Sequence, residues 1–208
     1  MLLVRHGATT HTAQRRLSGC TGEDPPLSAT GLEQAAALAR SLVRDQARTD
    51  EAAGPVTAIV SSPVRRAHQT ATTLGSALGL PVGLDEDLRE IDFGAWEGLT
   101  AGQVQDGWPG GLDAWRSTTD QPAPDGESVD DVALRVAAAR ARLVAAHPGG
   151  TVLVVSHLYP VRLSVLDALD APRRSVHQML HQPTGVSEVV VTGDRSELVR
   201  HNDSGHLR

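Results

Sequence analysis

Three short apolar runs, far apart in the chain, are each followed by a stretch in which apolar residues recur with helical spacing. The runs are 2–4 (LLV), 56–62 (VTAIVSS) and 152–155 (VLVV). The helical stretches are 28–47, 63–79 and 160–170. Strands that alternate with helices are typical of a parallel sheet that is covered on both faces. The alternation therefore predicts an α/β fold, a three-layer α/β/α sandwich with a largely parallel sheet.

The boundaries of these elements carry local signals. Thr30 and Glu33 have the spacing of a capping box at the start of the first helix. Gly79 suits the left-handed cap at the end of the second helix. A loop is expected at 50–54, and residues 187–202 predict a closing hairpin around a Gly-Asp-Arg turn.

Residues 92–130 break the alternation, because this segment is rich in glycine, proline, aspartate and glutamine. Only five aromatic residues occur in the chain, and four of them lie here: Phe93, Trp96, Trp108 and Trp115. We interpret the segment as an excursion from the sheet that packs a small core and serves as a lid. The whole chain, 1–208, is expected to be a single domain.

Charge and composition exclude several classes of protein. The net charge of −6 argues against nucleic-acid binding, which requires a basic surface. No apolar run approaches the ~20 residues that span a bilayer, and the amino-terminal residues show no secretion signal. The single cysteine, Cys20, cannot form an internal disulfide. We therefore expect a cytoplasmic protein that binds neither nucleic acid nor membranes.

Arginine supplies all 19 cationic side chains, since the chain contains no lysine. Enzymes that form a Schiff base and nucleotide-binding P-loops both need lysine, so both are excluded. Arginine instead binds phosphate or carboxylate groups through two parallel hydrogen bonds. No cofactor is expected.

Polar side chains follow each of the three predicted strands. Arg5 and His6 follow the first, Arg66 the second after a short connection, and His157 the third. Ligands of open α/β sheets bind at the carboxyl ends of the strands, so these side chains should converge. Glu90 lies between the second helix and the excursion and can approach the same edge.

Such a group of residues suits metal-independent chemistry on a phosphomonoester. Two arginines bind a dianion, and a neutral histidine can attack phosphorus and form a covalent intermediate. A carboxylic acid can protonate the leaving oxygen, while a second, protonated histidine stabilises negative charge on the other oxygens. We expect no metal site, because five further histidines show no metal-ligand spacing with Cys, Asp or Glu: His147, His177, His181, His201 and His206.

Six motifs in this order also carry a family resemblance: LLVRHGATTHT, PLSATGLEQA, SSPVRRAHQTA, LREIDFGAWEG, PDGESVDDVALRV and VVSH. Together they resemble the histidine phosphatase superfamily, also called the phosphoglycerate-mutase-like family, over nearly the whole chain. The most similar branch is that of the small broad-specificity phosphatases, which includes the α-ribazole phosphatase-like enzymes.

The resemblance implies a role for each residue of the group. His6 would be the nucleophile that becomes phosphohistidine, and Arg5 and Arg66 would clamp the phosphoryl group. His157 would be the second pocket histidine, and Glu90 the proton donor to the leaving group.

Five further residues match or depart from weaker positions of the family. Thr12, Ser18 and Gly19 correspond to substrate-contact positions, although the family often has asparagine in place of Thr12. Leu158 replaces a glycine, and its backbone N–H can still donate to phosphate. Tyr159, the only tyrosine, is proposed to shape the leaving-group side of the pocket.

The remaining histidines are interpreted as uninvolved in the chemistry. Two lie near the motifs and are expected to be bystanders: His11 and His68. Five are expected at the surface: His147, His177, His181, His201 and His206.

The function predicted from these observations is hydrolysis of a small phosphorylated metabolite. One alternative is a cofactor-dependent phosphoglycerate mutase, although such enzymes carry several basic residues in the excursion and residues 92–130 contain only Arg116. The other is a catalytically inactive binding protein of the same fold. The sequence identifies neither the substrate nor the oligomeric state, and a homodimer stays open.

Overall fold

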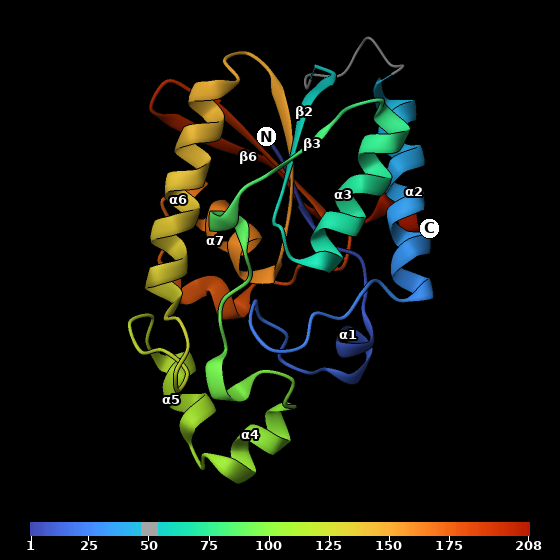
Figure 1. Cartoon of the computed structure of the whole chain (residues 1–208). Coiled ribbons are helices and arrows are strands. Elements are labelled where there is room, and N and C mark those ends of the chain that lie inside the picture. Colours follow the sequence, from blue (N-terminus) through green and yellow to red (C-terminus); the bar gives the residue numbers. More distant parts are fainter. Residues whose placement is uncertain (47–53) are drawn as a thin grey trace.

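The computed structural model describes residues 1–46 and 54–208, and within them six strands form one sheet (Figure 1). The strands are β1 (Leu2–Arg5), β2 (Val56–Ser61), β3 (Val82–Leu84), β4 (Thr151–Ser156), β5 (Val186–Thr192) and β6 (Arg195–Asp203). Their order in the sheet is β3-β2-β4-β1-β5-β6. The first four run parallel, while β5 pairs antiparallel with β1 and forms the predicted hairpin with β6.

Helices α2 (Ala29–Gln46) and α3 (Arg65–Leu78) cover one face of this sheet, and α6 (Val129–Ala146) and α7 (Leu158–Ala168) cover the other. The short helices α1 (Thr10–Gln14), α4 (Ala101–Gly107) and α5 (Gly111–Ser117) lie beyond the carboxyl ends of the strands (Figure 1). Leu2 and Val4 of β1 pack in a core with α2 and α3, whereas Leu3 between them packs with α6 and α7. This alternation follows from the two-residue period of a strand. The predicted three-layer sandwich with a largely parallel sheet is confirmed (Figure 1).

The first helix differs in detail from the prediction. Ser28, not Thr30, caps α2, because the Ser28 hydroxyl accepts a hydrogen bond from the Gly31 N–H at 3.1 Å. Thr30 therefore lies inside the helix, and Leu32 in the same turn is half exposed. The last residue of the predicted helix, 47, and most of the predicted loop, 50–53, lie outside the described residues.

The other boundaries are closer to expectation. Gly79 has a φ of 69° and caps α3 as predicted. The third helix, α7, begins at Leu158, two residues before the predicted start. Strand β3 was not predicted, because it has only three residues, is partly exposed, and therefore lacks the apolar pattern of a buried strand.

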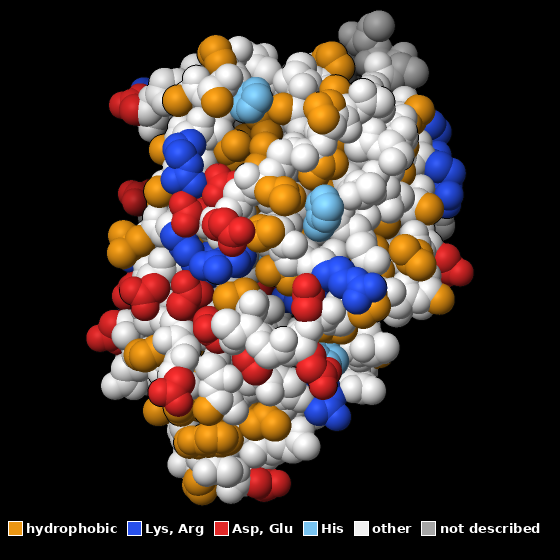
Figure 2. Space-filling model, in the orientation of Figure 1, with side chains coloured by type: hydrophobic (Ala, Val, Ile, Leu, Met, Phe, Trp, Pro, Cys, Tyr) orange, Lys and Arg blue, Asp and Glu red, His pale blue; other side chains and the backbone are white. Residues whose placement is uncertain are grey.

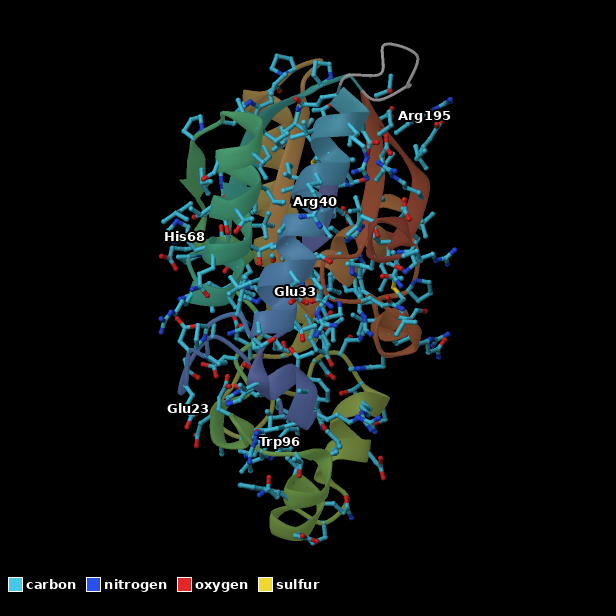
Figure 3. All side chains as sticks on the ribbon, turned by 90° about the vertical axis from the view of Figure 1, so that its right-hand side faces the viewer. Glu23, Glu33, Arg40, His68, Trp96 and Arg195 are labelled. Carbon is cyan, nitrogen blue, oxygen red and sulfur yellow. The ribbon has the colours of Figure 1, made fainter. Side chains whose placement is uncertain are left out.

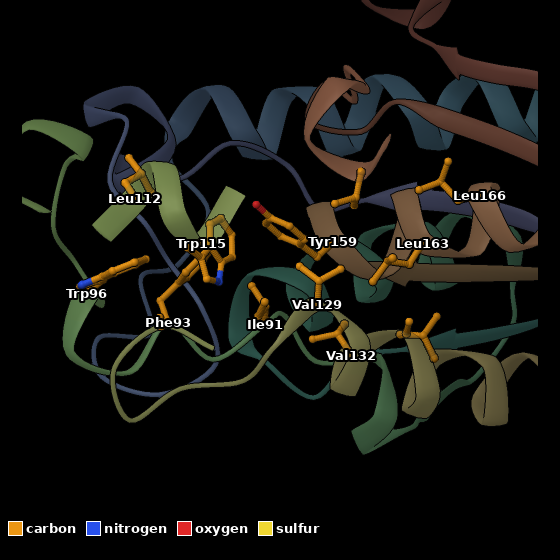
Figure 4. Packing of buried hydrophobic residues seen from close by; sticks show 14 of the residues in the cluster. Ile91, Phe93, Trp96, Leu112, Trp115, Val129, Val132, Tyr159, Leu163 and Leu166 are labelled. Carbon is orange, nitrogen blue, oxygen red and sulfur yellow. The ribbon is translucent and has the colours of Figure 1, made fainter. Parts of the chain in front are cut away.

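The excursion packs against the rest of the chain through an aromatic core, shown in Figure 4. The ring of Trp115 on α5 lies 5.9 Å from that of Phe93 and 5.8 Å from that of Tyr159 on α7, measured between centroids. Val129 at the start of α6 joins the same cluster. The predicted satellite core is thus continuous with the helices beside the sheet. Movement of residues 92–130 as a lid stays a prediction, as does the single domain.

Two glycines allow the start of α2 to lie against the segment that follows β1. A Cβ atom on Gly7 would lie 2.6 Å from the carbonyl oxygen of Gly31, and one on Gly31 would overlap the backbone of Ala8. Real Cβ contacts are never that short, so side chains at these positions would push the segment away. The segment that begins with His6 and Gly7 can therefore lie directly against the start of α2.

On the face shown in Figure 2, basic and acidic side chains lie beside one another. On α6, Arg142 lies 2.9 Å from Asp85 and 2.7 Å from Asp87, and Arg140 lies 2.8 Å from Asp167. Exposed pairs of this kind contribute ~1 kcal/mol or less.

No helix of the described residues is both long enough and apolar enough to cross a membrane.

Candidate active site

The polar residues that follow the strands meet at one cavity of about 400 Å³, at the carboxyl ends of β1, β2 and β4. The cavity is lined by Arg5, His6, Thr9, Thr12, Arg16, Leu17, Ser18, Arg66, Glu90, Phe93, Arg116, Leu158, Tyr159, Arg162 and His177. Eight of the ten predicted site residues are in this set. Gly19 and His157 are not, and both lie behind its wall, in contact with residues that line it.

His6 is buried and its two ring nitrogens have different partners. Nδ1 lies 2.7 Å from the carbonyl oxygen of Gly7, which can only accept a hydrogen bond. The proton therefore resides on Nδ1, and Nε2 carries the lone pair that accepts the Nε–H of Arg66 at 3.2 Å. Burial, with Arg66 and Arg5 nearby, holds the pKa of His6 well below its usual value. The ring is neutral at neutral pH, as a nucleophile must be.

Two arginines beside His6 are fixed by backbone carbonyl oxygens. Arg66 donates from Nη2 to Ser18 and Gly19, at 2.9 and 2.8 Å. Arg5 donates from Nη1 to His181 at 2.7 Å. Among the described residues, Nη1 of Arg66 and Nε of Arg5 have no hydrogen-bond partner. Burial lowers the pKa of Arg5 only to about 10, so the side chain stays charged and can bind an anion.

His157 lies behind His6, fully buried. The two ring centroids are 5.1 Å apart and the planes meet at 60°. Nε2 of His157 lies 2.8 Å from the hydroxyl of Ser62. Burial and the charge of Arg66 hold the pKa of His157 well below its usual value. The second histidine is thus neutral, which differs from the protonated state that the sequence suggested.

Glu90 is buried at the amino-terminal end of α7. One carboxyl oxygen, Oε1, accepts the N–H groups of Ile91 at 3.0 Å and Tyr159 at 3.1 Å, and Oε2 accepts that of Leu158 at 2.9 Å. Burial raises the pKa of Glu90, while the N–H of Ile91 and the charge of Arg66 oppose that rise. The carboxyl group therefore stays protonated to a higher pH than an exposed one. The Leu158 N–H, expected to donate to phosphate, is occupied by Glu90.

The weaker candidates act on the cavity in different ways. Thr12 lines it and binds the backbone N–H of Thr9 at 3.2 Å. Ser18 lines it and holds Arg66 through its carbonyl. Gly19 does not line it, and its N–H binds Oε2 of Glu97 at 2.8 Å. Gly19 therefore orients the arginine rather than touching a ligand.

Two predicted surface histidines are not at the surface. His177, in the turn of 3-10 helix at Arg173–Gln178, is half-buried and lines the cavity, with its ring centroid 5.0 Å from that of Trp115. His181 is buried, with Nε2 3.1 Å from the hydroxyl of Ser187. Both predictions were wrong, because these histidines are buried by tertiary contacts that no local sequence pattern indicates.

The two bystander histidines stay outside the cavity. His11 is buried and pairs with Glu23 at 3.0 Å. His68 is exposed on the outer side of α3 (Figure 3). Neither lines the cavity.

Three arginines that line the cavity were not singled out as site residues: Arg16, Arg116 and Arg162. The sequence indicates a place for Arg162 near the cavity, because Arg162 lies four residues after Leu158 and therefore on the same face of α7. The other two are brought to the cavity only by the tertiary fold.

The described residues contain no group of three or more His, Cys, Asp or Glu side chains that could hold a metal ion.

Comparison of the sequence with family models identifies the family of the chain. A family model described as histidine phosphatase superfamily (branch 1) matches residues 1–204. The chain belongs to this superfamily. The resemblance seen in the six motifs is thereby confirmed.

Curated relatives point in the same direction. A bifunctional protein of Mycobacterium tuberculosis is 39% identical over 208 residues, which are 100% of this chain and 54% of the relative. Glucosyl-3-phosphoglycerate phosphatase of the same organism is 39% identical over 148 residues, 71% of this chain and 61% of that protein. A probable phosphoglycerate mutase of Enterobacter sp. is 33% identical over 192 residues, 90% and 82% of the two chains. The chain spans about half the length of the first of these relatives.

Solved structures share the fold along their whole length. Mycobacterial glucosyl-3-phosphoglycerate phosphatase in complex with VO3 has a TM-score of 0.85 at 31% identity, with 97% of this chain and 98% of that chain covered. YhfR of Bacillus stearothermophilus has a TM-score of 0.87 at 29% identity, with 100% and 98% covered.

Proposed function

We propose that the protein is a metal-independent phosphatase that hydrolyses a small phosphomonoester through a phosphohistidine on His6. One observation carries the proposal: the Gly7 carbonyl fixes the proton of His6 on Nδ1, so that the lone pair of Nε2 lies beside the guanidinium of Arg66. A phosphoryl dianion bound by Arg66 would meet that lone pair. The names of the relatives support a phosphatase and leave the substrate open.

In the first step, Nε2 of His6 attacks phosphorus and the bond from phosphorus to the leaving oxygen breaks. Glu90 gives its carboxyl proton to that oxygen, so the leaving group departs as a neutral alcohol. The raised pKa of Glu90 keeps this proton available, and the lowered pKa of His6 keeps the nucleophile unprotonated.

In the second step, water attacks phosphorus and the bond between nitrogen and phosphorus breaks. The Glu90 carboxylate accepts the proton of the water, and the lone pair returns to Nε2. Arg5 and Arg66 bind the phosphoryl oxygens in both steps, and their positions are already held by the His181, Ser18 and Gly19 carbonyls.

The test is rapid quenching after mixing with a substrate that carries labelled phosphate. We expect label on the protein that is labile in acid and stable in base, and none on His6→Ala. His68→Ala removes an exposed histidine of α3 and serves as the matched control. Full activity of His6→Ala, or loss of activity on adding a chelator, would contradict the proposal.

A phosphoglycerate mutase is the second candidate. The cavity is more basic than the sequence indicated, because Arg16, Arg116 and Arg162 line it, and one relative is named a probable phosphoglycerate mutase. Interconversion of 2- and 3-phosphoglycerate that is faster than release of inorganic phosphate would establish this candidate instead.

A further inference from the structure

The cavity contains more positive charge than a phosphoryl group requires. Arg5 and Arg66 flank His6, and the two charges match those of a phosphoryl dianion. Arg16, Arg116 and Arg162 also line the cavity, whereas Glu90 is the only acidic residue among the described side chains that line it. None of these three arginines forms an ion pair with a carboxylate among the described residues.

Besides Arg5, Ser18 and Arg66, two of the lining side chains hold polar atoms that are buried without a hydrogen-bond partner among the described residues. They are Nε of Arg162 and Nε2 of His177. Arg162 donates from Nη1 to the carbonyl of Val176, at 3.1 Å, and is thereby held beside the segment that carries His177. A buried donor without an acceptor is unfavourable, so an acceptor is expected from a ligand or water.

One tautomer of His177 supplies a hydrogen-bond donor to the cavity. The hydroxyl of Tyr159 lies 3.4 Å from Nδ1, and burial raises the pKa of this tyrosine, so the hydroxyl keeps its proton and can either donate to Nδ1 or accept from it. When the hydroxyl donates, the proton of the neutral ring is on Nε2. In that tautomer His177 offers an N–H that no described residue accepts.

Arg116 contributes from the excursion. It directly follows Trp115, whose ring lies against the ring of His177, with 5.0 Å between centroids. Arg116 and Arg162 both lower the pKa of His177, after the larger effect of burial, because both place positive charge near its ring. The two arginines, on α5 and α7, therefore make one positive region of the cavity wall beside the neutral ring of His177 in the 173–178 turn.

We propose that Arg162, His177 and Arg116 form a second anion subsite, which binds an acidic group on the leaving-group portion of the substrate. The proposal rests on the proposed phosphatase function. It names the substrate class as small phosphomonoesters that carry a second carboxylate or phosphate. A cavity of about 400 Å³ accommodates a metabolite of that size.

Three compounds with the same carbon skeleton test the subsite. Glycerol 3-phosphate has no second acidic group, 3-phosphoglycerate has a carboxylate, and glycerol 1,3-bisphosphate has a phosphate. We expect a higher kcat/KM for at least one acidic compound than for glycerol 3-phosphate. The better of the two identifies the group that the subsite takes.

Substitutions then connect the preference to the subsite. Arg162→Gln is expected to lower the preference for the acidic compound about 10- to 100-fold, as for loss of a hydrogen bond to a charged group. Arg116→Gln should lower it about 2- to 5-fold, because Arg116 is exposed. Arg174→Gln, at an exposed arginine of the same turn as His177 that does not line the cavity, should leave it unchanged.

The outcomes separate the subsite from the proposed activity. Equal kcat/KM for the three compounds, or a preference that persists in both Arg162→Gln and Arg116→Gln, would overturn the subsite alone. Because Arg116 is exposed, its variant remains informative if Arg162→Gln does not fold. Failure to hydrolyse any of the three compounds or p-nitrophenyl phosphate would overturn the phosphatase itself.

Discussion

Replacing Glu90 with glutamine tests the proton donor with little change of shape. In the structure Oε1 of Glu90 accepts two backbone N–H groups and Oε2 accepts a third, from Leu158. A glutamine can present its oxygen to only one side, and its amide nitrogen cannot accept a hydrogen bond. Whichever way the amide turns, at least one buried N–H of Ile91, Leu158 or Tyr159 loses its acceptor.

The size of both effects follows from this geometry. An unpaired buried donor costs ~1–3 kcal/mol of stability. For a chain of 208 residues, each kcal/mol shifts the melting temperature by about 2–4 °C, so Glu90→Gln should melt roughly 2–12 °C lower. Loss of a general acid slows the chemical step by about 10²- to 10⁴-fold when the leaving group needs a proton.

The assay compares a leaving group that needs a proton with one that does not. Glycerol 3-phosphate releases a poor leaving group, whereas p-nitrophenyl phosphate releases a stable anion. Glu90→Gln should therefore lose far more of its kcat on the first substrate. Glu86→Gln changes an exposed carboxylate nearby and is the control. Equal loss on both substrates would refute the role of Glu90 as the proton donor.

Three further outcomes are expected. The activity should depend on pH in two ways. Because His6 must be unprotonated, kcat/KM should rise with pH through the pKa of His6, which lies below 6.5; because Glu90 must be protonated, it should fall through the pKa of Glu90, which lies above 4.5. A flat profile over about pH 4 to 9 would contradict both roles. Gly19→Ala should lower kcat/KM about 10²-fold, because a Cβ at position 19 would overlap the Glu97 carboxylate that accepts the Gly19 N–H. Gly107→Ala is the control, since the space around Gly107 is open. Equal activities of the two variants would contradict this prediction. Acid should lower the melting temperature, because His6 and His181 take up protons near pH 6.5 only in the unfolded chain. In the folded protein the pKa of His181 is lowered to about 3. A melting temperature that is constant from about pH 7.5 to 5 would be inconsistent with this.

The polar ends of buried strands were the most informative part of the sequence. Parallel strands place their carboxyl ends at one edge, so His6, Arg66 and His157 could be expected together although up to 151 positions separate them. Glu90 follows no strand directly, and its place at the start of α7 depends on three backbone contacts that no local pattern encodes.

Other features depend on tertiary contacts that a pattern does not contain. His177 reaches the cavity because Trp115 and Tyr159 lie against it, and those contacts join segments far apart in the chain. Helix α4 lies in glycine-rich sequence that does not predict a helix by composition. Its start nevertheless carries a local signal, because Thr100 and Gln103 form a capping box.

The two parts of the cavity wall differ in how freely they can change during evolution. Its apolar side belongs to the same core as Phe93, Trp115 and Tyr159, so a substitution that alters its shape also lowers stability. Arg116 is exposed on α5 and contributes to no such core, so it can be replaced at little cost to the fold. Related chains should therefore acquire new substrates first by exchanging charges at the mouth, and only later by reshaping the aromatic wall.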